Sequence, residues 1–204
     1  MPIQPESHQR LLDQLSFARS RAHEACGPAR RTLALLLAGA MEGPVFWLAP
    51  SWQAERLHAP GMRRFVDPGR FVFVRAQRAG DILWGLEEVM RSGAVGLVVG
   101  DLPATASRPP SLTQIRRLHL AGEAGARSGA QAPIALLLSA AGAAPGVQSR
   151  WHMAPAHGPG VSQEAWQLTR SRIRGQAVQS WRLRPEGAGF ALAPTCVPEG
   201  MENF

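Results

Sequence analysis

Residues 91–101 read RSGAVGLVVGD, an apolar run that follows a glycine and ends at an aspartate. Such a run, bounded by glycine and a charged residue, is typical of a parallel strand buried on both faces. Comparable patterns recur in order along the chain, with apolar runs at 45–48, 71–74 and 133–138 and amphipathic helical patterns at 79–92 and 112–126. Strands that alternate with helices of this length predict an α/β protein with a mainly parallel sheet flanked by helices.

The segments before this pattern contain two helical signals. Gly27-Pro28 precedes an alanine- and leucine-rich stretch, and a helix is expected over 29–40 because proline suits the first turn. Further upstream, four apolar residues are spaced roughly as in a helix: Leu11, Leu12, Leu15 and Phe17. Residues 1–25 are therefore predicted to be an N-terminal helical segment.

The pattern changes after residue 150. Short alternating stretches at 151–153, 165–174 and 177–184 predict strands, with a hairpin turn at Gly175-Gln176. The chain is thus expected to divide into an α/β core over 26–155, a C-terminal β extension over 156–184 and a loosely ordered tail over 185–204.

The composition excludes several kinds of chemistry. All 22 basic residues are arginine, and the chain contains neither lysine nor tyrosine. This excludes Schiff-base catalysis by lysine, nucleotide binding through a phosphate-loop lysine, and proton transfer by a tyrosine phenol. The net charge is +7 at pH 7, with the surplus in the second half, which favours association with polyanions or acidic partners.

Cysteines and apolar segments bear on metal binding and location. Cys26 and Cys196 are isolated, so the sequence supports neither a zinc site nor a disulfide framework. The first ten residues are polar and lack the apolar segment of a secretory signal peptide. The longest apolar run, 32–41, is too short to cross a bilayer. We expect a cytoplasmic protein with no membrane contact.

Two segments resemble the nucleotide-binding elements of RecA. Residues 91–101 resemble the strand that carries the Walker B aspartate, and residues 26–35 lie where RecA has its phosphate loop. Over residues 20–155 the chain is similar to the ImuA family, shortened RecA-like proteins of an SOS-inducible mutagenesis cassette, and more distantly to the SulA family. The ImuA resemblance rests on 58–61, 67–68, 71–75, 79–90 with Trp84 and Glu87-Glu88, 112–126, and the surroundings of Trp166 and Trp181. It implies a RecA-like fold.

The resemblance fails at the ATPase motifs. A working phosphate loop has the pattern GxxxxGK[ST], whereas this chain has Gly27-Pro28-Ala29-Arg30-Arg31-Thr32, which is two residues shorter, lacks the second glycine and places Arg31 beside Thr32. Pro50-Ser51 stands where RecA has its water-activating glutamate, and Ser139 stands where RecA has a nucleotide-sensing glutamine. Only Asp101 matches, at the Walker B position. We expect no catalytic residue, cofactor or metal ion.

Arginine and tryptophan alternate on the C-terminal predicted strands. Alternate side chains of a strand share a face, so the arginines of each strand are expected to project together. The loops at 102–111 and 139–150 correspond to the DNA-binding loops of RecA, and each keeps one arginine. The candidates for contact with a partner or DNA are Arg108, Arg150, Arg170, Arg172, Arg174, Trp181, Arg182 and Arg184. The alternative is a β extension whose tryptophans cover the sheet while its arginines are solvated.

The ImuA resemblance implies a non-catalytic accessory role in translesion DNA synthesis. The protein would bind an ImuB-type polymerase-like partner, with RecA as a further partner and any DNA contact weak or indirect. Two alternatives stay open: a SulA-like inhibitor of cell division that binds FtsZ, and a residual nucleotide- or DNA-binding ATPase. The sequence does not fix the oligomeric state.

Overall fold

A large mixed sheet organises the molecule in the computed structural model, which describes residues 7–103, 108–129, 131–157, 164–173 and 176–198. Its strands are β3 (Ala22–Cys26), β4 (Val45–Pro50), β5 (Phe71–Ala76), β6 (Leu97–Asp101), β7 (Ile134–Leu138), β8 (Ser149–Pro155), β9 (Trp166–Ile173), β10 (Gln179–Glu186) and β11 (Gly189–Thr195). They lie in the order β11-β10-β9-β8-β3-β7-β6-β4-β5. The pairs from β5 to β8 are parallel, and those from β8 to β11 are antiparallel.

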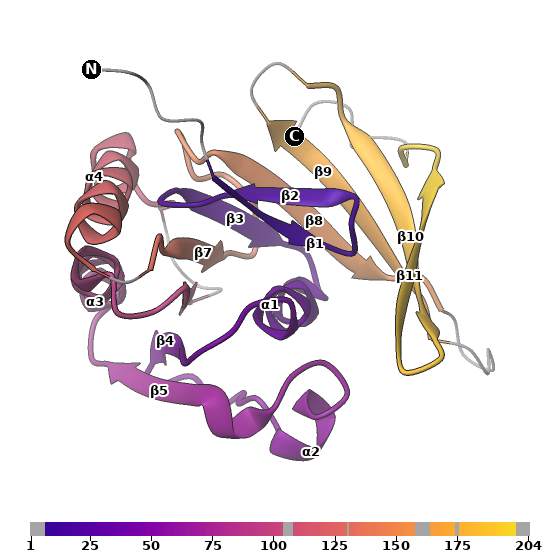
Figure 1. The fold of residues 1–204 in the computed structure, drawn as a ribbon, viewed down its shortest axis with the longest axis horizontal. Coiled ribbons are helices and arrows are strands. Elements are labelled where there is room, and N and C mark those ends of the chain that lie inside the picture. The colour runs from indigo at the N-terminus through magenta and orange to yellow at the C-terminus, as the bar shows by residue number, and fades with distance from the viewer. Residues whose placement is uncertain (1–6, 104–107, 130, 158–163, 174–175, 199–204) are drawn as a thin grey trace.

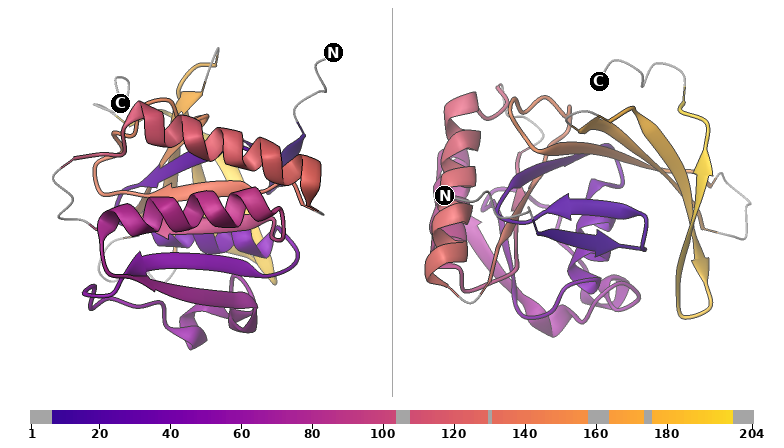
Figure 2. Two further views of the ribbon diagram at one scale, coloured as in Figure 1. Left: turned by 90° about the vertical axis from the view of Figure 1, so that its left-hand side faces the viewer. Right: turned by 45° about the horizontal axis from the view of Figure 1, so that its top comes forward.

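Helices cover both faces of the parallel part. On one face lie α3 (Ala79–Ser92) and α4 (Leu112–Ser128), and on the other lies α1 (Arg30–Gly39). A short helix, α2 (Ala59–Met62), and a 3-10 turn (Pro68–Arg70) belong to the connection between β4 and β5. A separate hairpin of β1 (His8–Leu11) and β2 (Leu15–Ala18) lies beside α1, and the curved sheet wraps around both (Figures 1 and 2).

Two apolar clusters hold these layers together. The larger one joins the concave face of the sheet to α1 and the hairpin, and it includes Leu37, Trp47, Trp151 and Trp181. The smaller one joins the opposite face to α3 and α4 through residues such as Leu86. The α/β class, the mainly parallel sheet with flanking helices and the C-terminal antiparallel strands are confirmed, and this architecture is compatible with a RecA-like fold.

The prediction of a helical segment over 1–25 is wrong for the described part of that range. Residues 8–18 form the β1–β2 hairpin, and residues 22–26 form a central strand. Leu12 and Asp13 turn the chain with φ of 50° and 57°, which a helix does not allow. Leu15 and Phe17 then point the same way because a strand repeats every two residues, and both are buried.

Two further expectations need correction. The tail over 185–204 is not loosely ordered throughout, because β10 continues to Glu186 and β11 pairs with it from Gly189 to Thr195. The run at 71–74 is not buried on both faces, because β5 is the last strand of the sheet and exposes much of its apolar surface. The predicted turn at Gly175-Gln176 lies in part outside the described residues, since 174–175 are not among them.

Candidate functional site

Several loops meet at the carboxyl ends of the parallel strands, which is where open α/β sheets place their ligand sites. Asp101 is the last residue of β6, and Arg31 lies in the first turn of α1, which follows β3. Glu55 belongs to the segment after β4. This corner of the molecule, which we call the α1 corner, contains Arg31 and Asp101, which the sequence analysis compared with nucleotide-binding motifs.

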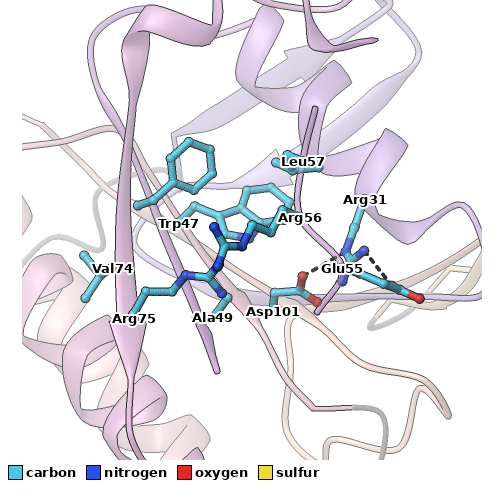
Figure 3. A pocket seen from close by; sticks show the side chains of 10 residues that line it. Arg31, Trp47, Ala49, Glu55, Arg56, Leu57, Val74, Arg75 and Asp101 are labelled. Carbon is cyan, nitrogen blue, oxygen red and sulfur yellow. Dashed lines mark hydrogen bonds and ion pairs between the residues drawn. The ribbon is translucent and has the colours of Figure 1, made fainter. Parts of the chain in front are cut away.

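An arginine closes the α1 corner. Arg31 donates from Nε to Asp101 Oδ2 at 2.8 Å and from Nη1 to Glu55 Oε2 at 2.8 Å (Figure 3). Gln53 Nε2 also donates to Asp101 Oδ2, at 3.2 Å. The Asp101 side chain is only 2% exposed. The Asp101 carboxylate, which resembles a Walker B aspartate in sequence, is therefore neutralised by the chain's own guanidinium.

Backbone N–H groups of the segment compared with a phosphate loop donate hydrogen bonds within the protein. A phosphate loop binds phosphate through free N–H groups that point into it. Here the Ala29 N–H donates to the carbonyl oxygen of Met153 at 2.9 Å, and the Arg30 N–H donates to that of Gly27 at 3.2 Å. The Thr32 N–H donates to the carbonyl oxygen of Ala29 at 2.9 Å. These three donors are not available to an anion.

Gly27 is required by the packing of the turn between β3 and α1. Its φ is +87°, and a Cβ at this position would lie 2.5 Å from the Met153 carbonyl oxygen and 2.7 Å from His152 Nε2. Both neighbours belong to β8, so the glycine lets that strand pass directly against the turn between β3 and α1. A side chain at position 27 would collide with β8.

These residues do not fit ATP with a magnesium ion. The N–H groups of Ala29, Arg30 and Thr32 donate within the protein, and the Asp101 carboxylate accepts a hydrogen bond from Arg31. Within the described ranges, no group of three or more histidine, cysteine or acidic side chains is placed to hold a metal ion. Thr32 belongs to α1 and supplies its N–H to the helix start, so it cannot direct that donor at a nucleotide phosphate.

The cysteine beside the α1 corner is held as a thiol. Cys26 ends β3 and is buried, and its Sγ–H donates to the carbonyl oxygen of Trp151 at 3.5 Å. Burial raises the pKa of Cys26 to about 11, with the nearby Glu24 carboxylate adding to the effect. A thiol with this pKa is not a nucleophile at neutral pH.

Arg150, a candidate for DNA contact, is instead a buried counter-ion. Its Nε donates to Glu24 Oε2 at 2.7 Å, and its Nη2 donates to the carbonyl oxygen of Ala144 at 2.7 Å. Ser139 Oγ donates to Glu24 Oε1 at 2.6 Å. Glu24 is fully buried and Arg150 is 6% exposed. The pair joins β3 to β8, and its bonds to Ser139 and Ala144 hold the loop between β7 and β8, so the expectation for Arg150 is corrected.

Arg108 is the one loop candidate that stays exposed. It lies with Leu102, Pro109 and Pro110 around a pocket of about 220 Å³ whose far side is the segment 139–143. Arg108 and Arg150 therefore border the same loop region but do not form a paired basic surface, because Arg150 is buried against Glu24.

The C-terminal arginines lie on two faces of the sheet. The register pairs Leu168 with Trp181 and Gln167 with Arg182, so Arg170 shares the face of Trp181 while Arg182 and Arg184 lie on the other face. A bulge shifts the register with β8, where Trp151 pairs with Arg170 and Arg150 pairs with Arg172, so Arg172 lies on the face opposite to Arg170. Arg182 and Arg184 project together, but Arg170 and Arg172 do not, so the expectation for the β9 arginines is corrected. Arg174 lies outside the described residues.

Trp181 belongs to the core and is not an exposed anchor. It is 2% exposed, and its ring lies 6.1 Å from that of Trp151. The guanidinium carbon of Arg170 lies 5.7 Å from the centre of the Trp181 ring, in a cation–π arrangement. Burial lowers the pKa of Arg170. At this position the structure follows the alternative in which tryptophan covers the sheet.

The sequence analysis missed an open pocket beside the α1 corner. It has a volume of about 210 Å³ and lies between β4, β5 and the segment 55–57 (Figure 3). Trp47 and Phe73 supply its apolar walls, and Arg56 and Arg75 line it together with the Arg31 network. The alternation of Phe71, Phe73 and Arg75 was a readable signal that these side chains share a face, but only the sheet order shows that the face is open.

Comparison with known proteins adds no family assignment: no protein-family model matches the chain, and a search of curated proteins gave no match. In the part of the chain that the structure describes, no helix is both long and apolar enough to span a bilayer. The fold and site thus define an α/β chain whose α1 corner is closed by its own residues and whose open pocket lies beside an edge strand.

Proposed function

We propose that this protein is a non-catalytic RecA-like accessory protein of SOS-induced mutagenesis and acts by binding other proteins. The observation that carries the proposal is the closed α1 corner, where Arg31 neutralises Asp101 and the N–H groups of Ala29, Arg30 and Thr32 donate within the protein. A nucleotide would have to displace a largely buried charge pair, and breaking such a pair costs about 3 kcal/mol. The fold then serves as a binding scaffold.

The partner class follows from the resemblance to the ImuA family. We infer binding to an ImuB-type polymerase-like protein in the cytoplasm, with RecA as a second partner. The net charge of +7 supports association with acidic protein surfaces and weak, salt-sensitive contact with DNA. Exposed apolar side chains on β5 and α3, including Phe73 and Trp84, supply surface suited to protein contact.

Nucleotide binding is tested by titration calorimetry with ATP and Mg²⁺ and by a turnover assay with and without single-stranded DNA. The expected result is no binding heat and no turnover. DNA-stimulated hydrolysis by the pure protein would overturn the non-catalytic role and favour the ATPase alternative.

Partner binding is tested by co-purification of the full chain with the ImuB-type protein and, separately, with RecA. Nuclease treatment and a high-salt wash are needed because a chain of charge +7 is retained by nucleic acid without specificity. Retention of the polymerase-like partner is the expected result. If the chain instead blocks FtsZ assembly in a sedimentation assay and retains no polymerase-like partner, the SulA-like alternative replaces the proposal.

A further inference from the structure

One edge of the sheet ends in an apolar strand with no neighbour. β5 pairs with β4 on one side and is the last strand in the sheet order. Among the described residues, the only other backbone bonds of β5 lie at its two ends, at Phe71 and Ala76. The outward backbone groups between them have no partner, and β5 lies at the rim of the molecule (Figure 1).

Its side chains are unusually exposed for their type. Val72, Phe73 and Val74 are 42%, 52% and 37% exposed, although all three are large and apolar. Natural edge strands are commonly shortened, charged or covered, because a flat apolar edge pairs with other chains. β5 spans six residues, and Arg75 is its only charged residue. This edge therefore has the properties of a strand-binding surface.

The adjoining pocket adds a requirement for negative charge. Arg31 is neutralised by Asp101 and Glu55, but no described acidic side chain pairs with Arg56 or Arg75. Arg75 makes one hydrogen bond, from Nη1 to the Pro50 carbonyl oxygen at 3.0 Å. Both guanidinium groups border a cavity walled by Trp47 and Phe73. The pocket can accept an apolar group with a carboxylate close to it.

We propose that an extended segment of a partner protein adds to the sheet along β5. Phe73 and Arg75 lie on the same face, two residues apart, so the incoming strand places an apolar side chain beside Phe73 and an acidic one beside Arg75 and Arg56. The partner segment thus carries an apolar and an acidic residue separated by one position. This inference deepens the proposed function and rests on it in taking protein binding as the role of the chain.

A second copy of this chain fits the surface less well. Two β5 strands paired with each other would oppose apolar residues, but they would supply no carboxylate to Arg56 or Arg75, since β5 has no acidic residue. They would also bring together two chains of charge +7. Charge complementarity therefore favours an acidic segment from another protein.

The probes are two fluorescein-labelled peptides, Gly-Ser-Thr-Phe-Thr-Glu-Thr-Ser-amide and the version in which Phe and Glu are exchanged. Two orders are needed because a parallel and an antiparallel strand place the same two residues beside Phe73 and Arg75 in opposite sequence order. Anisotropy is measured with the full-length protein at concentrations up to about 1 mM. We expect one of the two to bind, about tenfold more tightly than its counterpart with Lys in place of Glu. No binding by either peptide overturns the inference.

Backbone pairing is separated from simple pocket binding by N-methylation. A strand presents alternate N–H groups to each side, so methyl groups on one alternate set should abolish binding, while methyl groups on the other set should leave it unchanged. Strand addition is overturned if the two sets of methyl groups have equal effects. It is also overturned if acetyl-phenylalanine and acetyl-glutamate, added as separate molecules, bind as tightly as the intact peptide.

The protein variants are Phe73→Ser, Arg75→Gln and Arg56→Gln, with Arg172→Gln, at an exposed position of β9, as the charge-matched control. Each of the first three should weaken peptide binding about tenfold, and the control should not. Unchanged binding by Arg75→Gln and Arg56→Gln overturns the requirement for an acidic residue in the peptide.

Sedimentation velocity should show a monomer, and a dimer abolished by Phe73→Ser would make a second copy of this chain the occupant of the β5 edge. Failure of the polymerase-like partner to co-purify would count against the proposed function and not against peptide binding.

Discussion

Arg150 and Arg31 show how burial changes the role of one residue type. Both belong to a chain in which arginine supplies every lysine- or arginine-type side chain, Arg31 in the first turn of α1 and Arg150 near the start of β8. Each one neutralises a carboxylate that the fold has buried, Glu24 in one case and Asp101 in the other. Removal of one member of such a pair leaves an uncompensated buried charge.

Arg150→Met should therefore destabilise the protein. We expect a loss of about 3 kcal/mol in the free energy of unfolding, because Glu24 stays buried without its counter-ion. Urea unfolding followed by fluorescence measures the loss. The matched control is Arg172→Met, at an exposed position of β9, where the change should stay within about 0.5 kcal/mol. Equal stability of the two variants would show that the Glu24 pair contributes nothing.

His23 should make the stability depend on pH. Its Nε2–H donates to the Ala18 carbonyl oxygen, while Nδ1 accepts from Ser149 Oγ, which in turn accepts from Trp151 Nε1–H. Burial lowers the pKa of His23 from 6.5 to about 4. Between these pH values the unfolded chain binds more protons than the folded one, so stability falls as the pH decreases through this window.

The lost free energy approaches about 3 kcal/mol below pH 4. The measurement is the free energy of unfolding of the protein and of His23→Gln at several pH values from 7 to 4. Subtraction of the two curves removes the carboxylates common to both, and the difference should change mainly between pH 6.5 and 4. A flat difference would contradict a neutral, buried histidine.

At the scale of elements, the N-terminal hairpin is part of the core. Phe17 on β2 stacks on Trp151 of β8, with the ring centres 5.0 Å apart. Gln14 in its turn donates from Nε2 to the Leu192 carbonyl oxygen of β11 at 3.1 Å. The hairpin thus closes the concave side of the curved sheet, and the edge strand β5 lies at the opposite end of the strand order from β11.

Phe17→Ala should cost about 4 kcal/mol of unfolding free energy, because it leaves a cavity under Trp151. Phe73→Ala makes the same chemical change on β5, where the side chain is 52% exposed, and should cost less than about 1 kcal/mol. Denaturant melts of both variants provide the test. A small effect at Phe17 would mean that the hairpin is not required for the packed sheet.

At the scale of the molecule, the expected division at residue 155 is not a structural boundary. β8 ends there, but it is bonded along its length to β9, and Trp181 of β10 packs on Trp151. One sheet runs from β5 to β11, and one apolar cluster joins α1, the hairpin and the C-terminal strands. The described chain has the contacts of a single cooperative unit.

Thermal and urea unfolding should therefore show one transition, with the same midpoint by far-UV circular dichroism and tryptophan fluorescence. Deletion of 156–204 should expose Trp151 and Met153, which are fully buried in the whole chain, and should abolish the cooperative transition. Two separate transitions in the full chain, or a stably folded 1–155 fragment, would contradict this expectation.

The sequence predicted the regular part of the fold because periodicity was strong there. The helices at 30–39, 79–92 and 112–128 and the strands near 45–50, 97–101 and 134–138 lie where the pattern indicated. β3 was missed because its five residues include His23 and Glu24, whose polarity is compatible with burial only through Ser149 and Arg150, far along the chain. The hairpin was missed because turn residues with positive φ have no signal in spacing alone.

The sequence by itself determined the α/β class, the parallel core and the absence of an intact phosphate-loop motif, since these follow from local periodicity and residue identity. Only the tertiary structure decided which arginines are paired with buried carboxylates and which remain open to a partner. It paired Arg31 with Asp101 and Arg150 with Glu24, and it placed Arg75 beside an open pocket on an edge strand. Side chains of one chemical type differ in this way because sheet order and long-range contacts, not sequence neighbours, set their burial and their partners.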